Sequence, residues 1–329
     1  MKSGASTAKG FGKVILFGEH AVVYGQPALA AALSQGVVAH PIPASEDDEP
    51  WVDAPEWATT ARPGDGSRLG SALEAIVQSL TVCLGDAPKG GLRLEIQIPV
   101  GAGLGSSSAM AVALARSLAS TIVDDVTDQV VMEAALASEQ VFHGNPSGID
   151  HTTSTLGGII QFERGAVTPY RRLEGVSPFS MVIAQMAAGA DTGEMVSFVK
   201  ARLDRDPVEG AALLKKMGSL SYHALDALHD GDLRHIGALM DDAQKALVQI
   251  GVSTGLLDRG CEVARSAGAY GAKLTGAGGG GCLVALGGTS SLADIADALR
   301  ADGALSVFIA AAGAVGPHQS EASLVARCL

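Results

Sequence analysis

A glycine- and serine-rich segment at residues 99–110, Pro-Val-Gly-Ala-Gly-Leu-Gly-Ser-Ser-Ser-Ala-Met, constrains the fold of this chain more than any other. The alternating apolar residues of 92–98 predict a strand before it, and the small apolar residues of 111–119 predict a buried helix after it. Glycines let backbone N–H groups approach an anion, and the first helical turn supplies unpaired donors and a positive dipole end. The segment therefore predicts a cradle for nucleotide phosphate, with a plain tight turn as the alternative.

The cradle matches neither of the two commonest nucleotide-binding motifs. A Walker A loop needs Lys and Ser or Thr after its last glycine, whereas three serines follow Gly105. The spacing of Gly101, Gly103 and Gly105 is also wrong for a dinucleotide fingerprint. A second glycine cluster at 276–281 has the dinucleotide spacing, but a predicted strand follows it instead of a helix. This second cluster is either another loop beside the phosphates or a simple hairpin turn.

Length and charge limit the classes of protein that the chain can belong to. With 329 residues, of which 47% are hydrophobic, we expect two domains, at 1–175 and 176–329. The net charge of −12 argues against a nucleic-acid-binding protein. No apolar stretch reaches membrane length, so no membrane partner is expected.

The cysteines and the N-terminus favour a cytoplasmic location. The four cysteines (Cys83, Cys261, Cys282 and Cys328) are widely spaced and form no C-x-x-C or zinc pattern, which is typical of reduced thiols. The first nine residues contain no apolar signal core. The oligomeric state is left open by the sequence, and a homodimer is compatible with it.

The pattern along the rest of the chain predicts an α+β protein. A helix is expected over 67–84, and Thr127 is a good N-cap for a second helix that ends near Phe142. Residues 143–150 have the composition of a loop, and 44–66 form the most loop-like segment of the chain. Strands are predicted at 7–17, 36–43, 152–162, 182–186, 282–286 and 305–311, with three or four helices over 192–267 and another at 292–300.

Five polar residues near these segments are candidates for phosphoryl transfer: Lys13, Glu19, His20, Glu139 and Asp150. This reaction needs positioning, charge neutralisation and a base for the attacking hydroxyl. Asp150, in a glycine-bounded loop, is a candidate general base, and a lysine beside it would hold it ionised. From spacing alone, Lys13 is either that lysine or an ordinary strand residue.

A magnesium ion would need few protein ligands, all of them oxygens. Ser107 in the cradle and Glu139 are the natural candidates. Glu139 borders the apolar face of its predicted helix, where a carboxylate needs either a partner or a metal. The alternative is a solvated position at the edge of that face.

Four segments together resemble the mevalonate kinase family, within the superfamily of galactokinase, homoserine kinase, mevalonate kinase and phosphomevalonate kinase. Residues 13–28, with Gly-Glu-His, and 143–150, His-Gly-Asn-Pro-Ser-Gly-Ile-Asp, resemble mevalonate kinases in particular. Residues 99–109 and 273–282 resemble the second and third motifs of the whole superfamily. The resemblance implies a two-domain fold with a ribosomal-S5-like N-terminal domain and a ferredoxin-like C-terminal domain, with the active site between them.

The resemblance also implies a role for each matching residue. Asp150 would attract the proton of the mevalonate 5-hydroxyl, and Lys13 would pair with Asp150. Glu139 and Ser107 would bind Mg²⁺, although Ser106 and Ser108 are equally placed by the pattern. Glu19, His20 and Thr192 would face mevalonate. The ATP-binding residues would be Pro99, Gly101, Ala102, Gly103, Leu104, Gly105, Ser106, Ser107, Ser108, Gly276 and Gly278.

The chain departs from the family pattern at two positions. His151 follows the proposed base, where many relatives have Asn, and Gly193 stands where a basic residue is common. The second departure weakens the assignment of Thr192, which could instead be a helix N-cap in competition with Asp191.

The expected activity is transfer of the γ-phosphate of Mg-ATP to mevalonate. One alternative is a related kinase acting on phosphomevalonate, a sugar or homoserine. Another is a regulator that binds a nucleotide without catalysis, although Lys13, Glu139 and Asp150 are all present. An oxidoreductase is disfavoured because neither glycine cluster has the context of a dinucleotide site.

Overall fold

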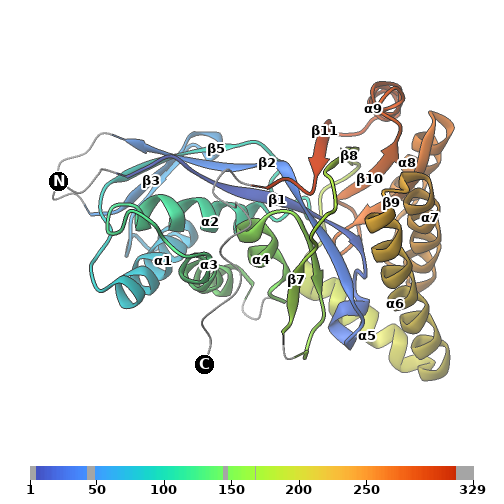
Figure 1. Ribbon diagram of the computed structural model, residues 1–329, viewed down its shortest axis with the longest axis horizontal. Helices are drawn as coiled ribbons and strands as arrows, with labels where there is room; N and C mark the ends of the chain where they lie inside the picture. Colours follow the sequence, from blue (N-terminus) through green and yellow to red (C-terminus); the bar gives the residue numbers. More distant parts are fainter. Residues whose placement is uncertain (1–4, 43–48, 144–146, 167, 316–329) are drawn as a thin grey trace.

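A long antiparallel pair of strands, β1 (Ala8–Phe17) and β2 (Ala28–Ile42), runs through the middle of the molecule (Figure 1). The computed structural model describes residues 5–42, 49–143, 147–166 and 168–315. The register of β1 on β2 shifts between Ile15 and Phe17, the last residue of the strand. The bulge lies where the chain leaves the sheet toward the polar residues of the first motif.

The N-terminal half is a sheet with helices packed against one face (Figure 1). β2 pairs with β5 (Gly91–Ile96), which continues the sheet through β3 (Trp51–Ala54) and β4 (Thr59–Ala61). The short strands β6 (Ile159–Phe162) and β7 (Tyr170–Arg172) extend it from β2. The helices of this half are α1 (Arg68–Leu84), α2 (Ser106–Ala119), α3 (Asp128–His143) and α4 (Ile149–Leu156), with 3-10 turns at η1 (Ala21–Tyr24) and η2 (Pro55–Trp57).

The C-terminal half has ferredoxin-like connectivity. Its strands are β8 (Phe179–Gln185), β9 (Ala269–Thr275), β10 (Cys282–Gly287) and β11 (Ser306–Ala312), in the spatial order β11-β8-β10-β9. Numbered along the chain, this is the order 4-1-3-2 of a βαββαβ unit. Helices α5 (Thr192–Arg205), α6 (Pro207–Asp230), α7 (Leu233–Ile250) and α8 (Gly255–Ser266) join β8 to β9, and α9 (Leu292–Ala301) joins β10 to β11.

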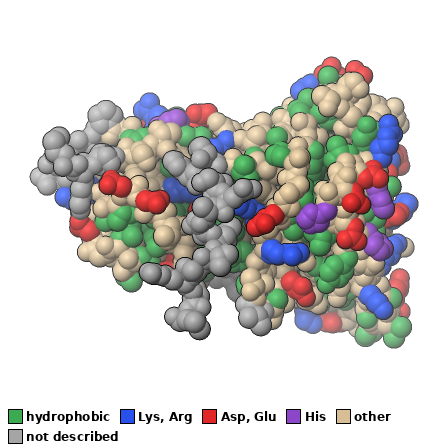
Figure 2. All heavy atoms as spheres, in the orientation of Figure 1, with side chains coloured by type: hydrophobic (Ala, Val, Ile, Leu, Met, Phe, Trp, Pro, Cys, Tyr) green, Lys and Arg blue, Asp and Glu red, His purple; other side chains and the backbone are tan. Residues whose placement is uncertain are grey.

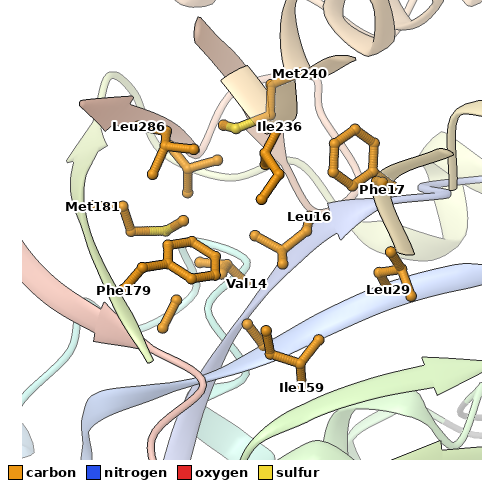
Figure 3. Close-up of a cluster of buried hydrophobic side chains, with 14 of the residues drawn as sticks. Val14, Leu16, Phe17, Leu29, Ile159, Phe179, Met181, Ile236, Met240 and Leu286 are labelled. Atoms are coloured by element: carbon orange, nitrogen blue, oxygen red, sulfur yellow. The ribbon is translucent and has the colours of Figure 1, made fainter. Parts of the chain in front are cut away.

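A shared core and one strand contact connect the two halves. Leu33 of β2 pairs with Ala312 of β11, so the sheet continues from one half into the other. Figure 3 shows apolar side chains of both halves packed together, among them Leu16 of β1, Phe179 of β8 and Met240 of α7. The domain boundary near residue 175 stays a prediction.

Most of the predicted elements are present. The helix expected over 67–84 is α1, capped by the Ser67 hydroxyl, which accepts from the Gly70 N–H at 2.9 Å. α3 begins after Thr127, whose hydroxyl accepts from the Val130 N–H at 3.4 Å. Residues 192–267 form four helices, α5 to α8, and the strands predicted at 7–17, 36–43, 182–186, 282–286 and 305–311 correspond to β1, β2, β8, β10 and β11.

Two predictions need correction. The strand predicted over 152–162 is wrong in its first part, because Ile149–Leu156 is helical and β6 begins only at Ile159. The β-branched residues there satisfy their hydroxyls within the helix, since Thr153 Oγ1 donates to the Ile149 carbonyl at 2.7 Å. The segment 44–66 also contains β3, η2 and β4, whereas its first part, 44–48, lies outside the described residues.

Acidic and basic side chains are interspersed on the face shown in Figure 2, and on this face the described residues form no continuous basic surface. Within the described ranges, every helix is too short or too polar to cross a membrane.

Candidate active site

The cradle predicted at 99–110 is a tight loop that leads directly into α2. Gly101, Gly103 and Gly105 have φ values of +68°, +83° and +70°, in the left-handed region that favours glycine. Ala102 and Leu104 alternate with these glycines, and their side chains are buried in the core. The backbone of the loop therefore faces outward at the glycines. The first N–H groups of α2 have no partner within the helix, as at any helix N-terminus, and they are available to an anion.

The second glycine cluster, 276–281, is a hairpin turn between β9 and β10, and it lies against the cradle. A Cβ on Gly103 would lie 3.9 Å from the Gly276 Cα, so the two loops are in contact. The second loop is packed tightly on its other side. A Cβ on Gly278 would lie 2.3 Å from the Val252 carbonyl oxygen, and one on Gly280 would lie 2.2 Å from that of Ala188. The hairpin predicted as one alternative is therefore present, and its contact with the cradle leaves the other alternative, a loop beside the phosphates, as a prediction.

Lys13 and Asp150 come together beside the cradle. The Lys13 Nζ lies 3.3 Å from Asp150 Oδ1 and donates to the Gly103 carbonyl at 3.2 Å. The strand β1 holds Lys13 in place, and its backbone N–H donates to the Leu104 carbonyl at 2.9 Å. Asp150 lies in the first turn of α4 after Gly148, whose φ is +93°. The Lys13 side chain is 4% exposed and that of Asp150 is 34% exposed, so the carboxylate is the more accessible partner.

Glu139, on α3, is a buried carboxylate that faces the start of α2. Burial is the main cause that raises its pKa, and the charge of Asp150 raises it further. Hydrogen bonding from the Ser107 hydroxyl and the charge of His143 oppose this rise. Its Oε1 atom has no hydrogen-bond partner among the described residues, although it is buried. An unpartnered carboxylate oxygen beside serine hydroxyls fits the oxygen ligands that Mg²⁺ prefers.

The serines of the cradle differ in their surroundings. Ser107 Oγ lies 3.4 Å from Nε2 of His143, the last residue of α3. Ser108 is fully buried, and its hydroxyl has no hydrogen-bond partner within the described ranges. Ser107 and Ser108 both lie near Glu139, and the choice among Ser106, Ser107 and Ser108 as a metal ligand stays open. Across the described part of the chain, no group of three or more His, Cys, Asp or Glu side chains is placed to hold a metal.

Glu19 lies at the end of β1 and forms a fully buried ion pair with Lys273 of β9. The Lys273 ammonium also donates to the Leu274 carbonyl at 2.7 Å and to the Ile15 carbonyl at 3.3 Å. Burial raises the pKa of Glu19, while the charge of Lys273, the stronger of two nearby lysines, lowers it. The predicted substrate residue Glu19 is thus engaged by Lys273.

His20 has a strained backbone and contacts the second loop. Its φ is +58°, one of two positive values among the described non-glycine residues, and such strain is common at functional sites. Its Nε2 donates to the Ala277 carbonyl at 2.8 Å, since a carbonyl can only accept. Burial lowers the pKa of His20, so the ring is neutral near pH 7 and Nδ1 is an acceptor.

Thr192 is exposed at the start of α5 and does not cap this helix. Asp191 is the N-cap, and its carboxylate accepts from the Glu194 N–H at 3.0 Å. The segment before α5 contacts the cradle and the second loop, because a Cβ on Gly189 would lie 2.4 Å from the Gly101 carbonyl oxygen. Thr192 is therefore on the same side of the molecule as the two loops, without a contact that assigns it a role.

Sequence reasoning assigned no role to four further polar residues at this site. Lys273 and Thr275 bind the strand of Lys13, and His143 and His151 flank the carboxylates. Lys273 belonged to a quoted motif, but its pairing with Glu19 depends on the fold. The ring of His151 is buried next to Asp150, and burial lowers its pKa. All four lie in or beside the segments that contain predicted site residues, and this position was the available signal in the sequence.

Together these residues can bind an anionic group and polarise a hydroxyl. Backbone donors of the cradle and α2 can face a triphosphate, and Glu139 with a serine can hold a divalent cation. The Lys13–Asp150 pair can attract a proton from an acceptor hydroxyl next to that phosphate. Phosphoryl transfer needs these elements and little covalent chemistry from the protein.

Comparisons with known proteins show which family the chain belongs to. Residues 69–158 match the family described as the GHMP kinases N terminal domain, and residues 224–315 match the GHMP kinases C terminal family. The chain is 31% identical to the mevalonate kinase of Pyrococcus furiosus over 88% of its own length and 91% of that protein. It is 34% identical to the mevalonate kinase of Methanothermobacter thermautotrophicus, over 87% and 90% of the two chains.

A solved structure gives the same result. The crystal structure of L. major mevalonate kinase in complex with R-mevalonate matches with a TM-score of 0.80 and 28% identity, over 94% of this chain and 97% of that one. The resemblance and the two-domain kinase fold class inferred from the sequence are thereby confirmed. The chain belongs to the mevalonate kinase family of the GHMP kinases and is an ATP-dependent kinase.

Proposed function

We propose that this protein transfers the γ-phosphate of ATP to the 5-hydroxyl of mevalonate, giving 5-phosphomevalonate and ADP. The observation that carries the proposal is the 3.3 Å contact of Lys13 and Asp150 beside the glycine cradle. Its family membership and the relatives named for the same activity support it.

In the proposed reaction, Asp150 is the catalytic base. Its partly exposed carboxylate accepts the proton of the 5-hydroxyl as the oxygen attacks the γ-phosphorus. Lys13 lies 3.3 Å from this carboxylate and places positive charge beside the phosphate that is transferred. The bond from the γ-phosphorus to the bridging oxygen breaks, and ADP leaves with that oxygen.

The cradle and the second loop bind the triphosphate. Backbone N–H groups of 101–105 and of the first turn of α2 would face the phosphate oxygens, and Gly276 and Gly278 would cover them. Glu139 and Ser107 would hold Mg²⁺, which supplies charge neutralisation to the phosphates. The unpartnered Glu139 Oε1 is the observation that favours this assignment.

Mevalonate would bind beside His20 and Thr192. The neutral His20 ring offers Nδ1 as an acceptor, and its Nε2 is held by Ala277. Glu19 would stabilise this part of the site from the protein interior, because its carboxylate is buried against Lys273. We further propose a cytoplasmic protein that can form a homodimer.

The test is a panel of acceptors with ATP and Mg²⁺. ADP release is measured with mevalonate, phosphomevalonate, galactose and homoserine, and the phosphorylated product is identified by mass spectrometry. The expected result is a kcat/KM at least about tenfold higher with mevalonate than with any other acceptor. A higher kcat/KM with another acceptor would reject mevalonate as the substrate, and tight ATP binding without any turnover would reject catalysis.

A further inference from the structure

Lys273 is a lysine with no exposed surface, and it lies in the middle of the protein. Its ammonium contacts Glu19 and the carbonyls of Ile15 and Leu274, which uses all three of its donors. Burying a lysine and a glutamate together costs desolvation that their attraction often fails to offset. A pair retained at this cost calls for a role other than stability alone.

Lys273 holds the strand that carries Lys13. Its Nζ donates to the carbonyl of Ile15, which is two residues after Lys13. Thr275 binds both the N–H and the carbonyl of Ile15. Thr275 Oγ1 accepts from the Ile15 N–H at 2.9 Å and donates to the Ile15 carbonyl at 3.1 Å. Side chains of β9 therefore bind β1 directly, just before the second glycine loop begins.

Two carboxylates lie within electrostatic reach of Lys13, and only Asp150 is in contact with it. The Lys13 Nζ contacts Asp150 at 3.3 Å. The positive charge of Lys13 also lowers the pKa of the Glu19 carboxyl. Glu19 is the more buried of the two, so an unpaired charge there would attract a cation more strongly. Lys273 supplies that cation, and the four groups form a series of alternating charge: Lys273, Glu19, Lys13, Asp150.

We propose that Lys273 is a positioning residue for phosphoryl transfer. By neutralising Glu19 and holding the Ile15 carbonyl, it keeps the Lys13 ammonium on Asp150. Lys273 itself touches neither the phosphates nor the acceptor. This inference rests on the proposed function for its kinetic readout, whereas its structural readout is independent of the substrate.

The structural test is a set of crystal structures of the full-length protein. In Lys273→Met, the Lys13 Nζ is expected to move from Asp150 to Glu19, lengthening its 3.3 Å contact by more than about 1 Å. Thr275→Val is the matched control, because it removes hydrogen bonds to the same Ile15 backbone and leaves the charges in place. The contact is expected to persist there. An unchanged Lys13–Asp150 contact in Lys273→Met would overturn the proposal.

The kinetic test separates positioning from folding. Lys273→Met is expected to lower kcat about tenfold or more while the KM for ATP changes less than about threefold. Removing the competing charge as well, in Lys273→Met with Glu19→Gln, is expected to recover at least half of the lost log kcat. A double variant no faster than Lys273→Met would contradict the proposal.

Two further arms keep the result interpretable. If Lys273→Met does not fold, Lys273→Gln takes its place, because an amide can donate to Glu19 without carrying charge, and the same displacement of Lys13 is expected. If the unmodified protein fails to phosphorylate mevalonate, the proposed function is rejected. The crystal structures then still decide whether Lys273 positions Lys13.

Discussion

The site contains two lysine–carboxylate pairs of the same chemistry in different surroundings. In the Lys13–Asp150 pair the carboxylate is 34% exposed, whereas in the Lys273–Glu19 pair the side chains are 0% and 1% exposed. The Lys13–Asp150 pair, in which only the carboxylate is partly exposed, lies beside the cradle and can meet a substrate. The buried pair is sealed between β1 and β9, so it can act only through its neighbours. The comparison shows that burial, more than residue type, separates a reacting pair from a supporting one.

The largest expected effect is on the exposed pair. Asp150→Asn should lower kcat about 10²- to 10⁴-fold, because an amide cannot accept the proton. The free energy of unfolding should change by less than about 1 kcal/mol, since the pair is partly exposed. Steady-state ADP release and urea denaturation measure the two effects. Asp204→Asn, in an exposed pair with Lys200 on α5, is the control and should turn over normally. Normal turnover of Asp150→Asn would remove Asp150 as the base.

The buried pair should show the reverse pattern in stability. Lys273→Met removes the buried partner of Glu19, and it should lower the free energy of unfolding by about 3–5 kcal/mol. Lys13→Met should cost about 1 kcal/mol, because Asp150 can turn to water. Urea denaturation of both variants measures the difference. Equal losses would show that the two pairs contribute alike, and the contrast drawn above would be wrong.

Glu139 extends the comparison to a buried carboxylate beside Asp150 and without a lysine of its own. Its folded pKa is raised above the ordinary value of 4.5, first by burial and then by Asp150. As the pH rises, the unfolded chain therefore loses the Glu139 proton before the folded protein does. The free energy of unfolding falls as the pH rises from 4.5 through the raised pKa. Thermal unfolding without ligands, measured over this range, should show the fall. Glu139→Gln should flatten it, and an equal slope in both proteins would reject this cause.

The smallest expected effects concern the start of α5. Thr192→Val should raise the KM for mevalonate by roughly 2- to 10-fold if its hydroxyl binds the substrate, with unchanged stability. Asp191→Ala should instead cost about 1 kcal/mol of stability through loss of the N-cap, with unchanged KM. Acceptor titrations and thermal unfolding separate the two residues. If only Asp191→Ala changed the KM for mevalonate, Asp191 and not Thr192 would be the residue that binds the substrate.

Local features of the site could be predicted from the sequence. The cradle, the start of α2 and the hairpin at 276–281 follow from glycine spacing and hydrophobic period, which act over a few residues. The helical conformation at Asp150 was missed, because threonines after it favour strands by propensity. In the structure, Gly148 begins a helix there and Thr153 bonds back along it.

The contacts between distant segments could not be predicted from residue patterns alone. Lys273 and Glu19 are separated by 254 positions, and nothing in the spacing of either segment indicates the pair. The Lys13–Asp150 contact has the same character, and only the family resemblance suggested it. The register in which β9 meets β1 decides the first contact, and the docking of α4 decides the second. Both are tertiary properties.

The binding of Ile15 by Thr275 has a consequence for the synthesis of the chain. Residues near the N-terminus leave the ribosome early, and β1 can pair with β2 almost at once. Yet the Ile15 N–H obtains its partner only when a residue 260 positions later has emerged, and Leu33 pairs with Ala312 later still. Nascent chains that end before β9 therefore lack a hydrogen-bond partner for the Ile15 N–H, close to Lys13. Completion of the site is one of the last events in folding, and contacts of such long range make it a slow one.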